Sequence, residues 1–179
     1  MTTATATTAT TVRPVPGWAR LAAHAVPLCV LPCGLWRIAL GLGAPLGLSG
    51  ELAEIYRGPD WTLTPYVLFL SLFTEAFALL TLGLVRPWGE VFPRWLPGVG
   101  GRRVPVTFAV TAAALGALIV MTIMAQVAAN WSSPQLMGNP GAPRGALYVL
   151  MAACYAPALA WGPLLLAVTV AYARRRTSA

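Results

Sequence analysis

Long runs of apolar residues, separated by short polar connections, set the organisation of this 179-residue chain. The runs cover about residues 21–43, 66–85, 106–128 and 146–172. Each reaches the roughly 20 residues that a helix needs to cross a hydrocarbon core about 30 Å thick. Because the runs are continuously apolar and do not alternate with polar residues, they predict helices rather than barrel strands. The sequence therefore predicts an all-α fold, an integral membrane four-helix bundle.

The segments outside the four runs have distinct characters. Residues 1–17 begin with a low-complexity Thr/Ala tract and predict a disordered N-terminal tail. A four-span transmembrane domain is expected over residues 18–173, followed by a basic C-terminal tail over residues 174–179. Proline interrupts the helical hydrogen-bond ladder, so Pro157 and Pro163 predict a kink or a tilt in the last span.

The composition supports membrane residence and excludes a soluble enzyme. Of all residues, 58% are hydrophobic and only 9% are charged, whereas a soluble domain carries about 25% charged residues. Twelve basic residues include no lysine, and alanine is abundant. These features favour a GC-rich genome and a bacterial source, so the expected location is the bacterial plasma membrane, crossed several times.

The arginines are unevenly distributed among the segments that flank the four spans. Three of these segments hold Arg13, Arg20, Arg86, Arg94, Arg102, Arg103 and Arg174–Arg176, and the other two hold Arg57 and Arg144. Four spans place the three arginine-rich segments on one side, which the positive-inside rule makes the cytoplasm. Both termini are therefore expected to be cytoplasmic. The net charge of +7 predicts contact with anionic lipids rather than nucleic acid, because no recognition motif is present.

Two opposite charges lie inside the apolar runs. Glu75 is about ten residues from either end of its run, and Arg37 is about six residues from the outer end of the first. A charge at the bilayer centre costs roughly 2.5–3.5 kcal/mol, so such a residue normally faces the protein interior and finds a partner. The two helices run antiparallel, which places Glu75 only about 5 Å deeper than Arg37. We therefore predict that they pair, directly or through water.

The role of this pair has two interpretations, and the sequence leaves both open. In the structural one, the pair fixes which helices meet, with Thr74, Tyr155 or Gln126 completing the hydrogen bonds, or Arg37 extends to the interface. In the catalytic one, Glu75 donates a proton to a lipophilic isoprenoid or lipid substrate and Arg37 positions it. Aromatic rings would then stabilise the developing cation. The candidate substrate-binding residues are Trp36, Tyr66, Phe69, Phe73, Tyr155 and Trp161.

The catalytic interpretation describes a membrane-embedded cyclase or isomerase. Packing between helices is the favoured alternative for Trp36 and Trp161. For the whole chain, the alternative is a non-catalytic accessory, immunity or assembly component of a membrane complex. A small transporter subunit fits least well, because one charge pair and four helices leave little room for a pathway.

Other features of the spans point to packing rather than chemistry. Alanine and glycine recur four residues apart in the third span and predict close helix approach, within the chain or in a homo-oligomer. These pairs are Ala112/Gly116 and Ala113/Ala117. Cys29, Cys33 and Cys154 match no redox or metal-binding spacing, so they are expected to be small buried side chains. We expect neither a metal nor a cofactor.

The connection between the first two spans is acidic. Ser49 is positioned to cap a short helix with Glu51 in its first turn. Together with Glu54 and Asp60, Glu51 would form an acidic lid on the outer face. Three carboxylates at irregular spacing match no calcium-binding signature, so a solvated loop is favoured over a cation site.

Three stretches, "LWRIALGLG", "LVRPWGEVFPRWLPGVGGRRVP" and "CYAPALAWGPLLLAVTVAYARRR", together resemble a group of small actinobacterial multi-pass membrane proteins. The resemblance covers most of the chain after the N-terminal tail. It implies a four-helix topology. It supplies no catalytic residues.

Overall fold

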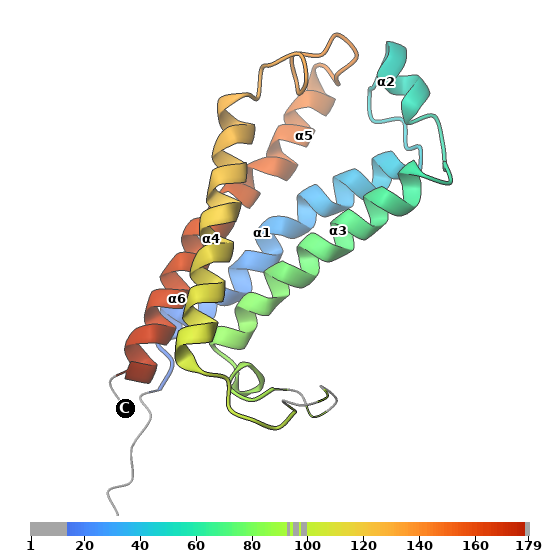
Figure 1. Ribbon diagram of the computed structural model, residues 1–179. Helices are drawn as coiled ribbons and strands as arrows, with labels where there is room; N and C mark the ends of the chain where they lie inside the picture. The colour runs from blue at the N-terminus through green and yellow to red at the C-terminus, as the bar shows by residue number, and fades with distance from the viewer. Residues whose placement is uncertain (1–13, 93, 95–96, 98–99, 178–179) are drawn as a thin grey trace, which may run out of the picture.

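The computed structural model describes residues 14–92, 94, 97 and 100–177, and Figure 1 shows that their regular structure is helical. The elements are α1 (Gly17–Gly41), α2 (Gly50–Ile55), α3 (Leu63–Leu80), η1 (Thr81–Leu84), η2 (Pro87–Gly89), α4 (Val106–Ala129), α5 (Ala146–Tyr155), η3 (Ala156–Ala160) and α6 (Trp161–Thr177).

Four helical segments are long and apolar enough to cross a membrane, which confirms the four predicted runs. They are Gly17–Gly41, Leu63–Leu84, Val106–Ala129 and Ala146–Thr177. Most of the predicted N-terminal tail, residues 1–13, lies outside the described residues. Helix α6 continues into the predicted basic C-terminal tail as far as Thr177, and its last turn holds Arg174, Arg175 and Arg176. Cations in that position are favoured by the partial negative charge at a helix C-terminus.

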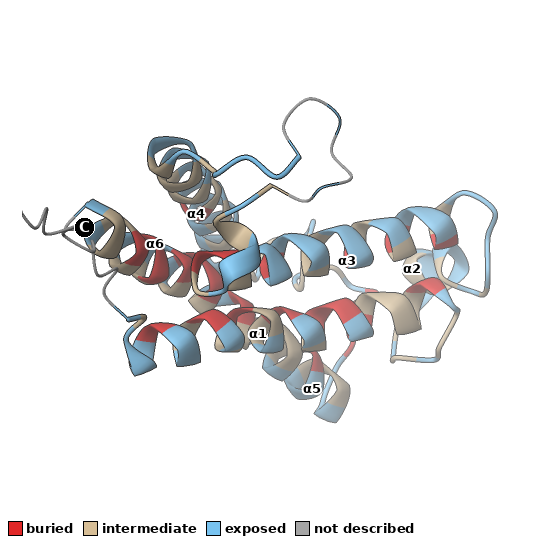
Figure 2. Cartoon of the chain, turned by 90° about the horizontal axis from the view of Figure 1, so that it is seen from below, coloured by how far each residue is buried: buried red, intermediate tan, exposed pale blue. Residues whose placement is uncertain are grey.

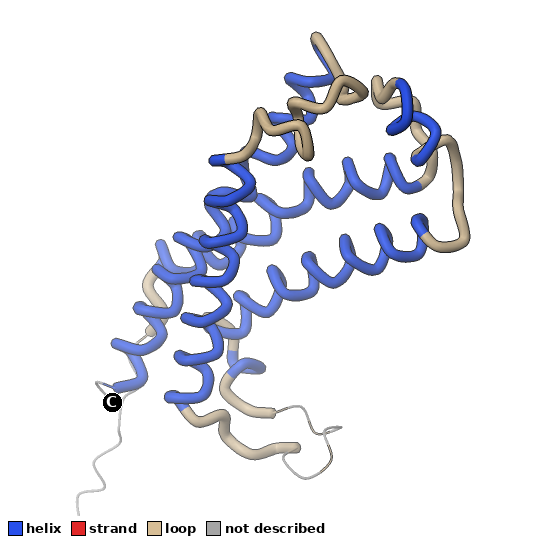
Figure 3. Tube along the Cα trace, turned by 45° about the horizontal axis from the view of Figure 1, so that its top comes forward, coloured by secondary structure: helices blue, strands red, loops and turns tan. Residues whose placement is uncertain are grey.

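The spans are arranged around α1 and α6. Helix α1 packs against α3 on one side and against α6 on another, and α4 packs on α6. Figure 1 shows that the α1–α3 pair diverges from α4 and α5 toward the end that carries α2. The start of α1, the α3–α4 connection and the end of α6 lie together at the opposite end (Figure 3). We call this the arginine-rich end.

The core lies between α1 and α6, where buried residues on the two helices face each other (Figure 2). On α1 they recur at the helical spacing of three or four residues, and the same spacing recurs on α6. The α1 stripe is Ala19, Ala23, Val26 and Val30, and the α6 stripe is Trp161, Leu165, Val168 and Tyr172. The small alanines on α1 leave room for the large side chains on α6, so the two helices pack closely.

Helices α4 and α6 approach closely at one small residue on each. Ala117 is the one fully buried residue of α4. A Cβ atom added to Gly162 would lie 3.2 Å from the carbonyl oxygen of Ala117 and would overlap the Cγ atom of Met121. The prediction of close approach is thus confirmed within the chain for Ala117. By contrast, Gly116 has open space where its Cβ would be.

The last span is interrupted where the prolines predicted a kink. Between α5 and α6, residues Ala156–Ala160 form the 3₁₀ helix η3, with Pro157 in its first turn. Pro163 lies in the first turn of α6, so it offers no N–H to Leu159 one turn earlier. The missing donors explain why the α-helix changes to a tighter helix here.

Polar contacts hold the arginine-rich end together. Glu90 of the α3–α4 connection accepts hydrogen bonds from Arg175 at 2.9 Å and Arg176 at 3.2 Å. His24 Nε2 accepts one from Arg86 at 3.1 Å, and its Nδ1 lies 2.7 Å from the Arg20 carbonyl oxygen. These contacts join α1 and α6 to the α3–α4 connection.

The α4–α6 crossing predicts a difference between two glycine substitutions. Gly162→Ala should destabilise the protein by about 1–3 kcal/mol, because the new methyl group overpacks the contact with α4. Gly116→Ala should leave stability unchanged or slightly raised, because its methyl meets no atom and alanine favours the helix. Unfolding of the purified variants in one detergent, followed by circular dichroism, measures both. Equal stabilities would contradict this packing.

Candidate functional site

The predicted intramembrane charge site lies between α1 and α3. The Arg37 guanidinium reaches from α1 to α3 and donates a hydrogen bond from one terminal nitrogen to Oγ1 of Thr74 at 2.9 Å. Thr74 in turn donates to the backbone carbonyl oxygens of Leu70 and Ser71. Its hydroxyl therefore accepts from a cation while it stays anchored to its own helix. Among the hydrogen-bond partners predicted for this site, Thr74 is confirmed.

The predicted direct ion pair between Arg37 and Glu75 is wrong. Among the described residues, ion pairs join Arg57 to Glu54 and Glu90 to both Arg175 and Arg176. The carboxylate of Glu75 has no hydrogen-bond or ion-pair partner among the residues that the structure describes. Thr74 and Glu75 are consecutive, so they point about 100° apart around α3, and the one nearer to α1 takes the guanidinium. Pairing through water stays a prediction.

The structure does not gather the predicted aromatic residues around Glu75. Tyr66, Phe69 and Phe73 are 61%, 64% and 47% exposed. They lie on the opposite side of α3 from Thr64, Val67, Ser71 and Ala78, the buried residues of that helix. Phe69 stacks on Phe73, which packs against Phe77 along the same face. The predicted substrate cage is therefore not formed by these three rings.

The other three aromatic candidates lie elsewhere. Trp36 and Trp161 are buried, as the packing interpretation expects, and Trp161 belongs to the α1–α6 core. Tyr155 packs edge-on against Trp131 and lines an apolar groove of about 310 Å³ between α4 and the α5–η3 segment. Gln126, another predicted partner of Arg37, bonds to Asn130 instead. Neither Arg37 nor Glu75 lines this groove.

Sequence reasoning missed several buried polar groups on α1, α3, η1 and α6. Five buried polar atoms have no partner among the described residues. They are Arg37 Nε, Ser71 Oγ, Thr81 Oγ1, Trp161 Nε1 and Tyr172 OH. Ser71, Thr74 and Ala78 of α3 and Thr81, the first residue of η1, recur every three or four residues, which places them on one face. This stripe of small and polar residues was the signal in the sequence for the face of α3 that packs on α1.

The acidic connection does not converge on a cation site. The short helix α2 forms with Glu51 in its first turn, as predicted, but the Ser49 side chain makes no capping bond. Its backbone N–H instead donates to Gly141 in the α4–α5 connection. Glu54 pairs with Arg57, and no group of three potential metal ligands forms among the described residues. The three carboxylates therefore act separately.

Asp60 begins α3. One oxygen of its carboxylate accepts from the Thr62 hydroxyl and from the backbone N–H groups of Thr62 and Leu63. In return, Thr64 Oγ1 accepts from the Asp60 N–H and donates to the Gly41 carbonyl at the end of α1. The Thr62 hydroxyl, with the N–H groups of Leu63 and Thr62, lowers the pKa of Asp60 from 3.8 to about 2. Asp60 thus fixes the turn that joins α1 to α3.

The Arg37 contact predicts the effect of removing one hydroxyl. Thr74→Val should destabilise the protein by about 1.5–3 kcal/mol, because a hydrogen bond to a charged group is lost. Thr122→Val is the matched control, because the Thr122 hydroxyl bonds only to its own helix. Both variants are compared by chemical unfolding in detergent. Similar losses in the two would show that Arg37 does not depend on Thr74.

The Asp60 contacts predict a stability change at acid pH. A carboxyl with a lowered pKa contributes stability above its unfolded value, and this contribution is lost as the pH falls from about 4 through about 2. The melting temperature should fall in that window for the natural chain. Asp60→Ala should melt lower at pH 7 and lose this part of the acid response, whereas Glu51→Ala should keep it. An unchanged acid response in Asp60→Ala would contradict the role.

Comparison of the chain with known proteins gives no indication of its function, so the geometry of the site is the guide. No protein-family model, curated protein or solved structure matches the chain. The resemblance to small actinobacterial membrane proteins stays a prediction.

Proposed function

We propose that the chain is a non-catalytic accessory or assembly component of a complex in the bacterial plasma membrane. In this proposal four spans cross the membrane, both termini are cytoplasmic, and Glu75 is the point at which a partner helix docks. The observation that carries it is the carboxylate of Glu75 in the middle of the α3 span, which has no partner among the described residues because Arg37 of α1 bonds to Thr74 instead.

The orientation rests on charge and on the positions of the helix ends. The arginine-rich end gathers the start of α1, the α3–α4 connection and the end of α6 (Figure 3). Nine of the 12 arginines fall within residues 1–20, in that connection or within residues 174–179. Since arginines are enriched on the cytoplasmic side of membrane proteins, this end is the cytoplasmic one.

The docking role follows from the cost of an unpaired charge in lipid. A carboxylate near the bilayer midplane costs several kcal/mol unless it is paired or protonated. Glu75 is partly exposed, and Leu72 and Leu79, three residues before it and four after, are 65% and 46% exposed. These three residues share one face of α3. A partner helix with a cationic or hydrogen-bonding side chain would cover this face and satisfy the carboxylate.

Acid catalysis by Glu75 is less well supported by the same geometry. The hypothesis needs a cavity beside Glu75 with aromatic rings around a cation. Tyr66, Phe69 and Phe73 lie on a different face of α3, and Arg37 is engaged by Thr74. An enzyme on a lipophilic substrate remains the alternative, with Glu75 as its acid.

Photocrosslinking from α3 in the native host tests the docking role. A photoreactive amino acid at Leu79 should crosslink to one discrete membrane protein, which mass spectrometry identifies. Glu75→Gln should lower the adduct yield about tenfold, because a charge-assisted hydrogen bond contributes at least about 1.4 kcal/mol. The same probe at Phe73, on the other face of α3, is the control and should yield lipid adducts.

Two results would contradict the proposal. The first is a Leu79 probe that yields no protein adduct, and the second is an adduct whose yield is unchanged by Glu75→Gln. An adduct of twice the chain mass would identify a second copy as the partner. Loss of turnover of a lipophilic substrate in Glu75→Gln membranes, with no adduct in the natural chain, would favour the enzyme.

A further inference from the structure

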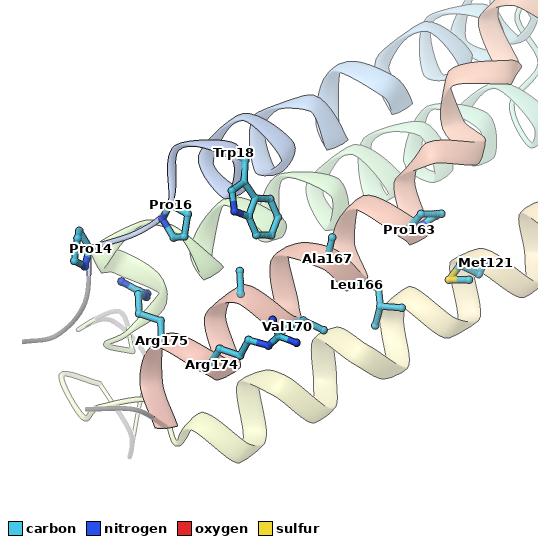
Figure 4. A pocket seen from close by; sticks show the side chains of 11 residues that line it. Pro14, Pro16, Trp18, Met121, Pro163, Leu166, Ala167, Val170, Arg174 and Arg175 are labelled. Atoms are coloured by element: carbon cyan, nitrogen blue, oxygen red, sulfur yellow. The ribbon is translucent and has the colours of Figure 1, made fainter.

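An apolar groove of about 700 Å³ runs along α6 between the start of α1 and helix α4 (Figure 4). Pro163 of α6 and Met121 of α4 lie at its far end. Leu166, Ala167 and Val170 line its length on α6. Arg174 and Arg175 lie at its other end, where Arg175 is near Pro14, which precedes α1 (Figure 4). The groove is therefore apolar along its length and cationic at one end.

The length of the groove matches one leaflet of a membrane. From Pro163 to Arg174 the helix rises about 16 Å, at 1.5 Å per residue. Half of a hydrocarbon core about 30 Å thick is about 15 Å. Trp18, which lines the groove near the start of α1, is half exposed, and tryptophan is favoured at the level of the headgroups. An acyl chain in the groove would place its headgroup beside the two arginines.

The charges at the mouth favour an anionic ligand. Arg175 donates to Glu90, so part of its charge is already balanced. Arg174 is exposed and takes part in none of the ion pairs found among the described residues. Arg174, Arg175 and Arg176 against the single carboxylate of Glu90 leave an excess positive charge at this position. Anionic headgroups are attracted to such clusters beside a membrane span.

We propose that this groove binds one anionic phospholipid from the leaflet at the arginine-rich end. One acyl chain lies along α6 between α1 and α4, and the phosphate accepts hydrogen bonds from Arg174 and Arg175. This site is separate from Glu75, so the lipid proposal does not depend on the docking role proposed for that residue.

Native mass spectrometry of the full chain tests the site. Protein released from vesicles of equal parts phosphatidylglycerol and phosphatidylcholine should retain one phosphatidylglycerol in preference to phosphatidylcholine. Arg174→Gln should lower this preference about fivefold, because each arginine near an anionic surface contributes about 1 kcal/mol. Arg144→Gln is the matched control, because Arg144 is exposed and lies in the α4–α5 connection, away from the arginine-rich end. It should leave the preference for phosphatidylglycerol unchanged.

A second variant tests the groove without altering charge. Ala167→Phe fills the groove and should lower retention of both lipids, whereas Ala125→Phe at an exposed position of α4 should not. Equal retention of the two lipids by the natural chain would overturn the proposal. So would an Arg174→Gln variant with unchanged preference, or a photoreactive residue at Ala167 that crosslinks to a protein instead of lipid.

Discussion

The packing of α1 against α6 is the contact on which the rest of the structure depends. In lipid, apolar side chains gain no hydrophobic free energy by meeting each other, so helices associate through close van der Waals contact and polar bonds. The stripe of Ala19, Ala23, Val26 and Val30 supplies the close contact with α6. Because α3 packs on α1 and α4 packs on α6, both outer helices are placed by this central pair.

Arg37 lies on the same stripe of α1, seven residues after Val30. There α1 is covered by η3 and α5, which precede α6 in the chain. A long cationic side chain fits this position because Thr74 of the neighbouring helix accepts its hydrogen bond. The contact between α1 and α3 therefore includes polar bonds, whereas the buried stripes between α1 and α6 are largely apolar. Thr64, which bonds to the last carbonyl of α1, adds a second polar contact near the helix ends.

The number, order and length of the spans could be predicted because each depends on local composition. The proline break before α6 was predictable for the same reason. The rotation of each helix about its axis was not. The rise per residue along the two helices placed Glu75 at nearly the same membrane depth as Arg37. Thr74 is one residue earlier, and its side chain points about 100° away from that of Glu75 around the helix axis. The stripe on α3 that packs on α1 is made of a few small polar residues and gives only a weak hydrophobic period, so it was overlooked and Phe69 and Phe73 were assigned to the wrong side.

Backbone hydrogen bonds shape the connections at both ends of the molecule, and the two ends differ in the side chains that fix them. At the end that carries α2, backbone bonds and a capping carboxylate shape the connections, as Ser49 and Asp60 show. At the arginine-rich end, side-chain charges join α6 to the α3–α4 connection through Glu90. Arg175 lines the groove along α6 and also donates to Glu90. A headgroup in the proposed lipid site would therefore share one guanidinium with the α3–α4 connection, which would link occupation of the groove to the position of that connection.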